Sequence, residues 1–258
     1  MKSQSIVEKI IKKIIPVLFI ISLLGIWEAV VRINKIEPYI MPAPSKVAEA
    51  LCTDFSVLWE NMLVTLYEGM LGFVIAIALS LVLAVMIDLI PLLKQAIYPV
   101  LVISQTIPTI AIAPLFLIWF GFGILPKVVV VVLVCFFPMV ISLVDGMEAV
   151  DQELINHFRL MGANKIQRFI HLKLPFGLIN FFSGMRIAAT YSIMGAIIGE
   201  WLGGNKGLGV YMTRAKSVYA IDKMFAAIVL IVAISMIVFG AIHLIEKIAT
   251  PWMRQKGE

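Results

Sequence analysis

Three charged side chains stand within or at the edge of long apolar runs. Glu68, Arg186 and Glu200 interrupt stretches that consist otherwise mainly of aliphatic, aromatic and small residues. A charge in hydrocarbon is costly, so charged groups in membrane segments usually face a polar pathway or an oppositely charged partner. These residues are therefore candidates for lining a solute pathway. The alternative stays open that Glu68 and Glu200 lie at membrane interfaces while Arg186 reaches water or pairs.

The sequence contains no recognisable catalytic or nucleotide-binding motif. Gly203–Gly209 has neither the spacing nor the final hydroxyl residue of a phosphate-binding loop, so we interpret it as a glycine hinge or re-entrant turn outside the membrane, with Gly207 and Gly209 as gate candidates. The three histidines form no metal-protease motif, and the two cysteines belong to no metal or redox cluster. We predict no catalytic, cofactor-binding or metal-binding residue in this chain.

The composition places the chain in a membrane. Hydrophobic residues make up 61% of the 258 residues, charged residues make up 14%, and the mean hydropathy is +1.02. This is too little polar surface to cover a soluble globule. The net charge of +5 does not indicate nucleic-acid binding, because the basic residues stand between apolar runs, where they orient helices. We expect a multi-pass protein of the cell membrane, in contact with lipid.

Six apolar stretches come near or exceed the ~20 residues that cross a bilayer. The first is longer than the ~7–15-residue core of a secretory signal and lacks a cleavage site, so we expect it to be retained. The expected organisation is a cytoplasmic segment over 1–13, an all-α transmembrane domain over 14–248 and a cytoplasmic tail over 249–258. The predicted spans cover 14–31, 63–87, 96–120, 128–144, 178–201 and 224–245.

The third and fifth spans carry the features expected beside a pathway. Pro99, Pro108 and Pro114 predict that the third span is kinked or interrupted, and the freed backbone groups are tolerable only beside a cavity or another helix. Gly195 and Gly199 form a small-residue face on the fifth span, which favours close packing inside a bundle or between subunits. The candidate pathway or gate residues are Glu68, Gln105, Pro108, Pro114, Arg186, Gly195, Gly199, Glu200, Gly207 and Gly209.

The distribution of Lys and Arg favours cytoplasmic N- and C-termini. With this orientation the inner set is Lys2, Lys9, Lys12, Lys13, Lys94, Arg159, Lys165, Arg168, Lys173, Lys247, Arg254 and Lys256. The outer set is Arg32, Lys35, Lys46, Lys127, Lys206, Arg214, Lys216 and Lys223. The inner set is the larger and is concentrated before the first span.

The polar interval over 156–175, between the fourth and fifth spans, predicts two short helices joined by a glycine. Asp151 is a good N-cap for the first helix. Gly162 ends it, because glycine adopts the left-handed backbone that often follows a helix. Asn164 can cap the second helix. Pro175 fits the first turn of the apolar span that follows.

This interval resembles the cytoplasmic loop of binding-protein-dependent ABC importer permeases. The family pattern is Glu-Ala-Ala, three residues, Gly, nine residues, then Ile-x-Leu-Pro. Here the interval has Asn156-His157-Phe158, three residues, Gly162, nine residues, and Leu172-Lys173-Leu174-Pro175. The glycine, the spacing and the final Leu-Pro match, whereas the Glu-Ala-Ala triplet is replaced.

The resemblance extends over nearly the whole chain and is similar to permeases of the nitrate, sulfonate and taurine type. It is carried by MPAPSKVAEAL, GFVIAIALSLVLAVMI, QTIPTIAIAPLFLIWFGFGILPK, FFPMVISLVDG and GMRIAATYSIMGAIIGEWLGG. The third of these segments is also similar to permeases for thiamine precursors or riboflavin, so the solute stays open. The resemblance implies a type I importer fold and a solute delivered by an extracytoplasmic binding protein. It also implies two ATPase subunits that hold ATP and Mg²⁺. We expect a second copy of this chain, which makes a homodimer with two halves that can move against each other, and a heterodimer with a different permease is the main alternative.

The chemistry of the loop agrees with docking on an ATPase. A membrane protein without a nucleotide site can receive energy from a partner or from an ion gradient. Apolar anchors beside basic residues suit a short helix that enters a groove. The predicted coupling residues are Asn156, His157, Phe158, Arg159, Met161, Gly162, Lys165, Phe169, Leu174 and Pro175. An ion-coupled secondary transporter and an integral membrane enzyme are the alternatives, but we find neither a clear internal repeat nor a catalytic cluster.

The first prediction concerns orientation. In a chain whose native Cys52 has been changed to serine, Lys206→Cys should react with an impermeant maleimide in intact cells. Lys165→Cys should react only after permeabilisation, because the charge distribution places 165 in the cytoplasm. The opposite labelling pattern would invert the topology and remove the 156–175 loop from any cytoplasmic partner.

Overall fold

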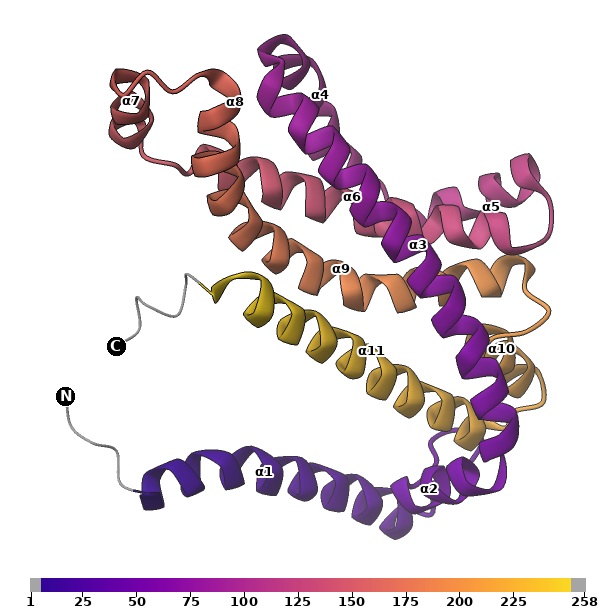
Figure 1. The fold of residues 1–258 in the computed structure, drawn as a ribbon. Coiled ribbons are helices and arrows are strands. Elements are labelled where there is room, and N and C mark those ends of the chain that lie inside the picture. Colours follow the sequence, from indigo (N-terminus) through magenta and orange to yellow (C-terminus); the bar gives the residue numbers. More distant parts are fainter. Residues whose placement is uncertain (1–5, 252–258) are drawn as a thin grey trace. The chain divides into compact units, whose positions relative to one another are not determined.

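The computed structural model describes the backbone of residues 6–251 and the side chains of residues 14–251. The predicted terminal segments over 1–13 and 249–258 therefore lie partly outside the described residues, although α1 already begins at Ile6. Within the described range the regular elements are all helices (Figure 1). They are α1 (Ile6–Ile33), α2 (Pro44–Thr53), α3 (Phe55–Leu89), α4 (Pro91–Ser104), α5 (Thr109–Phe120), α6 (Ile124–Glu148), α7 (Gln152–Leu160), α8 (Lys165–Arg168), the π-helix η1 (Phe169–Lys173), α9 (Leu174–Gly203), α10 (Leu208–Ser217) and α11 (Ile221–Ala249).

The helices confirm the predicted set of spans. Five are long and apolar enough to cross a membrane, and α4 with α5 makes a sixth if the pair is one span. Several extend beyond the predicted bounds. The second predicted span is part of α3, which is 35 residues long, and the fifth is part of a 39-residue helical run over Lys165–Gly203. Hydropathy locates the apolar centre of a span, whereas the polar continuation of a helix gives no such signal.

The predicted interruption of the third span is confirmed. The axes of α4 and α5 differ by 103° across the break between Ser104 and Thr109. Pro108 stands at the N-cap of α5 with an extended backbone. A proline disfavours the helical conformation of the residue before it, so Ile107 cannot easily continue α4. Pro99 and Pro114, by contrast, lie inside α4 and α5 without ending them.

The larger of two compact units covers residues 60–210 and 230–258, and its centre is the α6–α9 pair (Figure 1). Glycines allow this pair to approach closely. A Cβ added at Gly195 would lie 3.1 Å from the Val131 Cα, and one at Gly199 would lie 2.9 Å from the Lys127 Cα. The alternative left open by the sequence is thereby resolved, because this small-residue face packs inside one chain.

Polar contacts in this unit gather at its two ends. At one end, Lys173 pairs with Asp88, and Lys94 pairs with Glu148. At the other end, residues of α3 and α9 meet the glycine turn before α10. Leu117, near the end of α5, contacts Gly203 at this second end. The bent α4–α5 pair therefore runs from one end to the other, which supports counting it as one crossing.

The smaller unit covers residues up to 59 and 211–229. Asp54 joins its elements, because its carboxylate accepts a hydrogen bond from the Tyr211 hydroxyl at 2.8 Å and pairs with Lys223 at 2.7 Å. The hydrogen bond from Lys223 lowers the pKa of Asp54 below its usual value. In the same unit, the Glu28 carboxylate of α1 accepts hydrogen bonds from the backbone N–H and the hydroxyl of Ser45. The Ser45 N–H lies in the first turn of α2 and has no partner within that helix, so Glu28 satisfies it.

Candidate functional site

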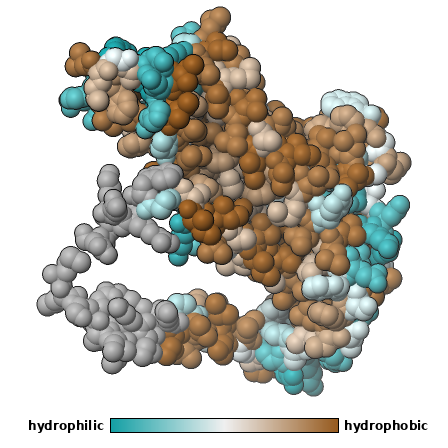
Figure 2. All heavy atoms as spheres, viewed as in Figure 1, coloured by the Kyte–Doolittle hydropathy of each residue, from teal (hydrophilic) through white to brown (hydrophobic). Residues whose placement is uncertain are grey.

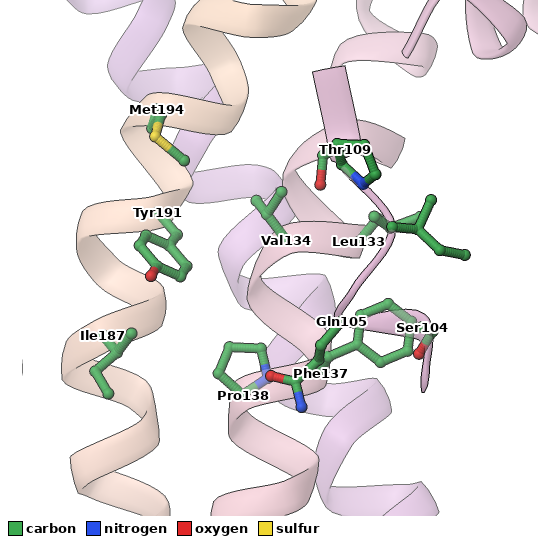
Figure 3. A pocket seen from close by; sticks show the side chains of 12 residues that line it. Ser104, Gln105, Thr109, Leu133, Val134, Phe137, Pro138, Ile187, Tyr191 and Met194 are labelled. Carbon is green, nitrogen blue, oxygen red and sulfur yellow. The ribbon is translucent and has the colours of Figure 1, made fainter. Parts of the chain in front are cut away.

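A cavity of about 520 Å³ opens where the third span is interrupted (Figure 3). The side chains of α6 lie between those of α9 on one side and those of the break on the other. The volume falls in the ~300–1,000 Å³ range of small-molecule sites. Its lining residues are Ser104, Gln105, Ile107, Pro108, Thr109, Leu133, Val134, Phe137, Pro138, Ile187, Tyr191 and Met194.

The cavity lining is apolar with a few uncharged polar groups. Ser104, Gln105, Thr109 and Tyr191 offer hydroxyl or amide groups, and the other lining side chains are aliphatic, aromatic, proline or methionine. None of these twelve described residues is charged at neutral pH. Such a lining can contact an aromatic or aliphatic solute and form hydrogen bonds with it, but it supplies no countercharge for an ion.

Two of the ten predicted pathway residues, Gln105 and Pro108, line this cavity. The sequence reasoning did not name the other ten lining residues. Spacing could have indicated some of them, since Ile187, Tyr191 and Met194 recur at four and three along one face of α9. The remaining predicted residues lie elsewhere. Pro114 is exposed on α5, for example.

Glu200 holds a turn in place instead of lining the cavity. Its side chain is buried, with 1% of its surface exposed, and accepts hydrogen bonds from the Thr65 hydroxyl at 2.7 Å and from the Gly209 N–H at 2.6 Å. The Thr65 hydroxyl in turn accepts from the Leu208 N–H at 2.8 Å. Gly207 passes so close that a Cβ there would lie 2.2 Å from the Glu200 carboxylate. The glycines are required because the turn wraps around this carboxylate.

Glu68 also lies outside the cavity, in a buried ion pair. The Lys127 ammonium donates to its carboxylate at 2.6 Å, and both residues are at least 94% buried. The sequence-based assignment of Lys127 to an outer loop is therefore wrong, because this lysine lies in the first turns of α6 against Gly199. The other Glu68 oxygen has no hydrogen-bond partner among the described residues. The charge balance at this corner depends on Lys127.

Arg186 pairs with Glu246 of α11 and donates to the Ser183 hydroxyl. The sequence left open whether Arg186 lines a pathway, reaches water or forms an ion pair, and the ion pair is what the structure shows. The pair links α9 to α11 and leaves the guanidinium away from the cavity lining. All three charged residues that the sequence singled out are thus compensated by polar partners.

The polar interval folds as predicted over its first part. Asp151 accepts from the Glu153 N–H as the N-cap of α7, and Gly162 follows the helix with φ of 81°. Asn164 and Gln167 form a reciprocal capping box at the start of α8. Figure 2 shows hydrophilic residues gathered over α7 and α8.

The second part of the interval differs from the prediction, because α8 does not end before the fifth span. It continues through the π-helix η1 into α9, and the Leu174 N–H donates to the Phe169 carbonyl five residues back. Pro175 stands in the first turn of α9, as predicted, although no break precedes it. The wider π turn occurs where the proline ring would otherwise crowd the preceding turn.

The exposed apolar residues of this loop lie at its tip. Leu160 is 87% exposed and Met161 is 82% exposed, whereas Phe158 is half-buried. The prediction of Phe169 as a docking anchor is wrong. Its side chain is 8% exposed and belongs to the hydrophobic core with Met147 and Phe181. Leu160 was missed because helical spacing alone does not show which face packs inward.

Family comparison assigns this architecture. A family described as "Binding-protein-dependent transport system inner membrane component" matches residues 76–249, which is more than half of the chain. The chain belongs to this family. It is a multi-pass inner-membrane permease of an ABC importer, as predicted from the sequence. Its role is transport, and the alternatives of a secondary transporter and a membrane enzyme are set aside.

Curated relatives span nearly the whole permease. It is 35% identical to the formylaminopyrimidine transport permease protein ThiX of Halalkalibacterium halodurans, over 93% of this chain and 96% of that protein. It is 32% identical to the riboflavin transport system permease protein RibX of Chloroflexus aurantiacus, over 89% and 87%. The taurine transport system permease protein TauC of Escherichia coli is 26% identical, over 89% and 86%.

A solved structure supports the type I permease fold. The permease matches a chain of the MetNI methionine ABC transporter with a TM-score of 0.55, over 75% of this chain and 94% of that one, at 22% identity. At this identity the likeness concerns the fold alone.

The second prediction concerns the buried ion pair between Glu68 and Lys127. Lys127→Met should lower the melting temperature of the detergent-solubilised permease strongly, because removing one partner of a buried ion pair costs about 3–5 kcal/mol. Glu68→Met together with Lys127→Met should recover part of that loss, since no uncompensated charge remains. Thermal unfolding followed by fluorescence measures both. A double variant less stable than Lys127→Met alone would contradict the pairing.

Proposed function

We propose that this permease conveys a small, uncharged, aromatic nitrogen heterocycle of the kind named for ThiX and RibX. The observation that carries the proposal is the cavity beside the interrupted span, which combines Phe137 and Tyr191 with the amide of Gln105 and contains no charged lining residue. An anion such as a sulfonate would be desolvated there without a countercharge. A neutral ring with hydrogen-bonding edges would contact both the apolar and the polar groups.

The relatives support the same solute class. The proteins named for formylaminopyrimidine and riboflavin are 35% and 32% identical to this permease, and the protein named for taurine is 26% identical. The family comparison alone leaves the solute open, because a permease receives what its binding protein selects. The uncharged lining favours the heterocycle over the sulfonate.

We further propose that a separate ATPase drives transport by docking on the tip of the α7–α8 loop. The ATPase, and not this chain, would bind ATP and Mg²⁺. Leu160 and Met161 are exposed apolar side chains beside Arg159, a combination that suits insertion into a groove of a partner. Among the predicted coupling residues, Gly162 sets the angle between α7 and α8, and Leu174 and Pro175 begin the span that carries Tyr191.

The proposed complex contains two copies of this permease, two ATPase subunits and an extracytoplasmic binding protein. Alternating access needs two halves that move against each other, and two-fold symmetry is the commonest way to supply them. Gly195 and Gly199 no longer support this proposal, since they pack on α6. The support that remains is the family and the cavity at the broken span, which a second copy would close.

The third prediction tests the solute. Vesicles containing the permease with its partners should accumulate labelled formylaminopyrimidine or riboflavin in an ATP-dependent manner, and should accumulate taurine poorly. Gln105→Met keeps the side-chain size but removes the amide, with its C=O acceptor and its NH2 donor, so heterocycle uptake should fall roughly three- to tenfold, as expected for one lost hydrogen bond. Tyr191→Phe should act in the same direction.

Tyr67→Phe is the matched control, because this tyrosine is exposed on α3 and lies outside the cavity lining. It should leave uptake unchanged. Taurine uptake above heterocycle uptake, or full heterocycle uptake by Gln105→Met and Tyr191→Phe together, would refute the proposed solute class.

The fourth prediction tests coupling. Met161→Asp and Gly162→Pro should each abolish solute-stimulated ATP hydrolysis and reduce co-purification of the ATPase more than a hundredfold. The first places a charge in the docking interface, and the second cannot adopt the positive φ of Gly162. Co-purification of a differently tagged permease copy in the wild-type complex reports the two-copy arrangement.

Val218→Asp serves as the control, because it adds the same charge at an exposed position after α10, outside the loop. It should leave ATPase binding intact. Retention of the ATPase and of stimulated hydrolysis by both loop variants would show that the docking surface lies elsewhere.

A further inference from the structure

A second, smaller cavity lies at the base of the α7–α8 loop, and most of its charged residues are basic. Its volume is about 250 Å³. Residues at the end of α3, on one face of α7 and along the run from α8 into η1 line it. The lining residues are Asp88, Gln152, Ile155, Arg159, Lys165, Arg168, Phe169 and Lys173, and we call this the basic pocket.

The lysines of the basic pocket already bind the acceptor groups at the end of α3. Lys173 pairs with Asp88 at 2.5 Å, and Lys165 donates to the carbonyl of Leu89 at the C-terminal end of α3. Arg159 and Arg168 have no carboxylate within ion-pair distance in the described part of the chain. Four cations therefore share one carboxylate, and the two guanidinium groups are available to an anion from outside the chain.

The size and chemistry of the basic pocket fit a phosphate group. A guanidinium presents paired N–H donors that match phosphate oxygens bidentately, and lysines add point charges. The volume is below the ~300–1,000 Å³ that encloses a drug-sized ligand, so a whole nucleotide would not be enclosed. A single phosphate would place its oxygens among donors from three helices.

The position of the basic pocket indicates the source of the phosphate. Asp88 and Leu89 end the span α3, and Lys165–Gly203 is a helical run that itself passes into the membrane. The pocket is therefore at the boundary of the bilayer, on the side to which the charge distribution assigns the cytoplasm. Basic pockets between transmembrane helices at this boundary bind anionic lipid headgroups.

We propose that the basic pocket binds a phosphate-bearing anion, supplied by the headgroup of an anionic phospholipid of the inner leaflet. The anion joins Arg159 of α7 to Arg168 of α8 and contacts Lys165 and Lys173, which themselves bind the end of α3, and so fixes the loop relative to the spans. An acidic side chain of a partner protein is the competing occupant. The headgroup is favoured because the pocket sits between the ends of two spans, whereas the exposed apolar side chains of the loop lie at its tip.

The test uses the purified full-length permease alone, so it depends on neither the solute nor the ATPase. Phosphatidylglycerol, phosphatidylcholine and inorganic phosphate are each titrated into the detergent-solubilised protein, and the melting temperature is followed. Phosphatidylglycerol should raise it saturably, and phosphatidylcholine should not. In the double variant Arg159→Gln with Arg168→Gln, the phosphatidylglycerol concentration at half-effect should rise at least tenfold.

Lys216→Gln with Lys247→Gln is the matched control, since both lysines are exposed, neither lines the pocket, and the change in net charge is the same. It should respond like the wild type. Native mass spectrometry of the same samples counts the lipids that remain bound and distinguishes loss of binding from loss of fold. One fewer bound phosphatidylglycerol in the arginine variant, with a normal melting temperature in the absence of lipid, would establish the site.

An equal response of wild type and arginine variant to phosphatidylglycerol would overturn the proposal. Protection of the wild type by inorganic phosphate but not by phosphatidylglycerol would retain the phosphate chemistry and overturn the lipid source. If the arginine variant lost ATPase co-purification while its phosphatidylglycerol binding stayed normal, the occupant would be a partner side chain and the proposal would be wrong.

Discussion

A backbone polar group that faces hydrocarbon without a hydrogen-bond partner costs several kcal/mol, and the third span is where this chain meets that constraint. Between Ser104 and Thr109 the helix stops, so backbone groups near the centre of the span are freed. They can exist there only if they are enclosed by protein or lie beside a cavity. The tight α6–α9 pair provides the opposite walls of that enclosure, with Phe137 and Tyr191 facing the break. The cavity and the broken helix are therefore one feature, and each requires the other.

The sequence predicted features that depend on neighbouring residues and missed contacts between residues far apart in the chain. Local signals were sufficient for the caps Asp151 and Asn164, the turn at Gly162 and the break at Pro108, because each depends on the backbone preferences of a few neighbouring residues. Hydropathy located six crossings but not their polar extensions. Lys127 is 59 residues from Glu68, and Thr65 is 135 residues from Glu200, and no periodicity reports such pairings. For the same reason Lys127 was placed in a loop and Phe169 on a surface.

The three charges that first suggested a pathway turn out to stabilise its surroundings. Each of Glu68, Arg186 and Glu200 has a polar or charged partner on another element, and none lines the cavity at the break, although Glu68 and Lys127 line a separate cavity of about 360 Å³. Strong ionic contacts would hold a solute at one position, and the described lining of the cavity at the break contains no charged side chain to make them. Charge is used instead at the two ends of the larger unit, where it ties helices to each other and to the glycine turn.

The π-helix between the loop and the fifth span has a consequence for register. A π turn is equivalent to one extra residue in an α-helix, and each residue turns the helix by about 100°. Residues at α-helical spacing therefore do not stay on one face from α8 into α9, although the helical run over Lys165–Gly203 is unbroken. If one residue were deleted from Phe169–Lys173, the run could become a plain α-helix. Lys165 would then rotate by about 100° about the helix axis, away from the Leu89 carbonyl to which it now donates a hydrogen bond. A single-residue deletion here would thus re-aim the whole loop while leaving hydropathy and span lengths almost unchanged.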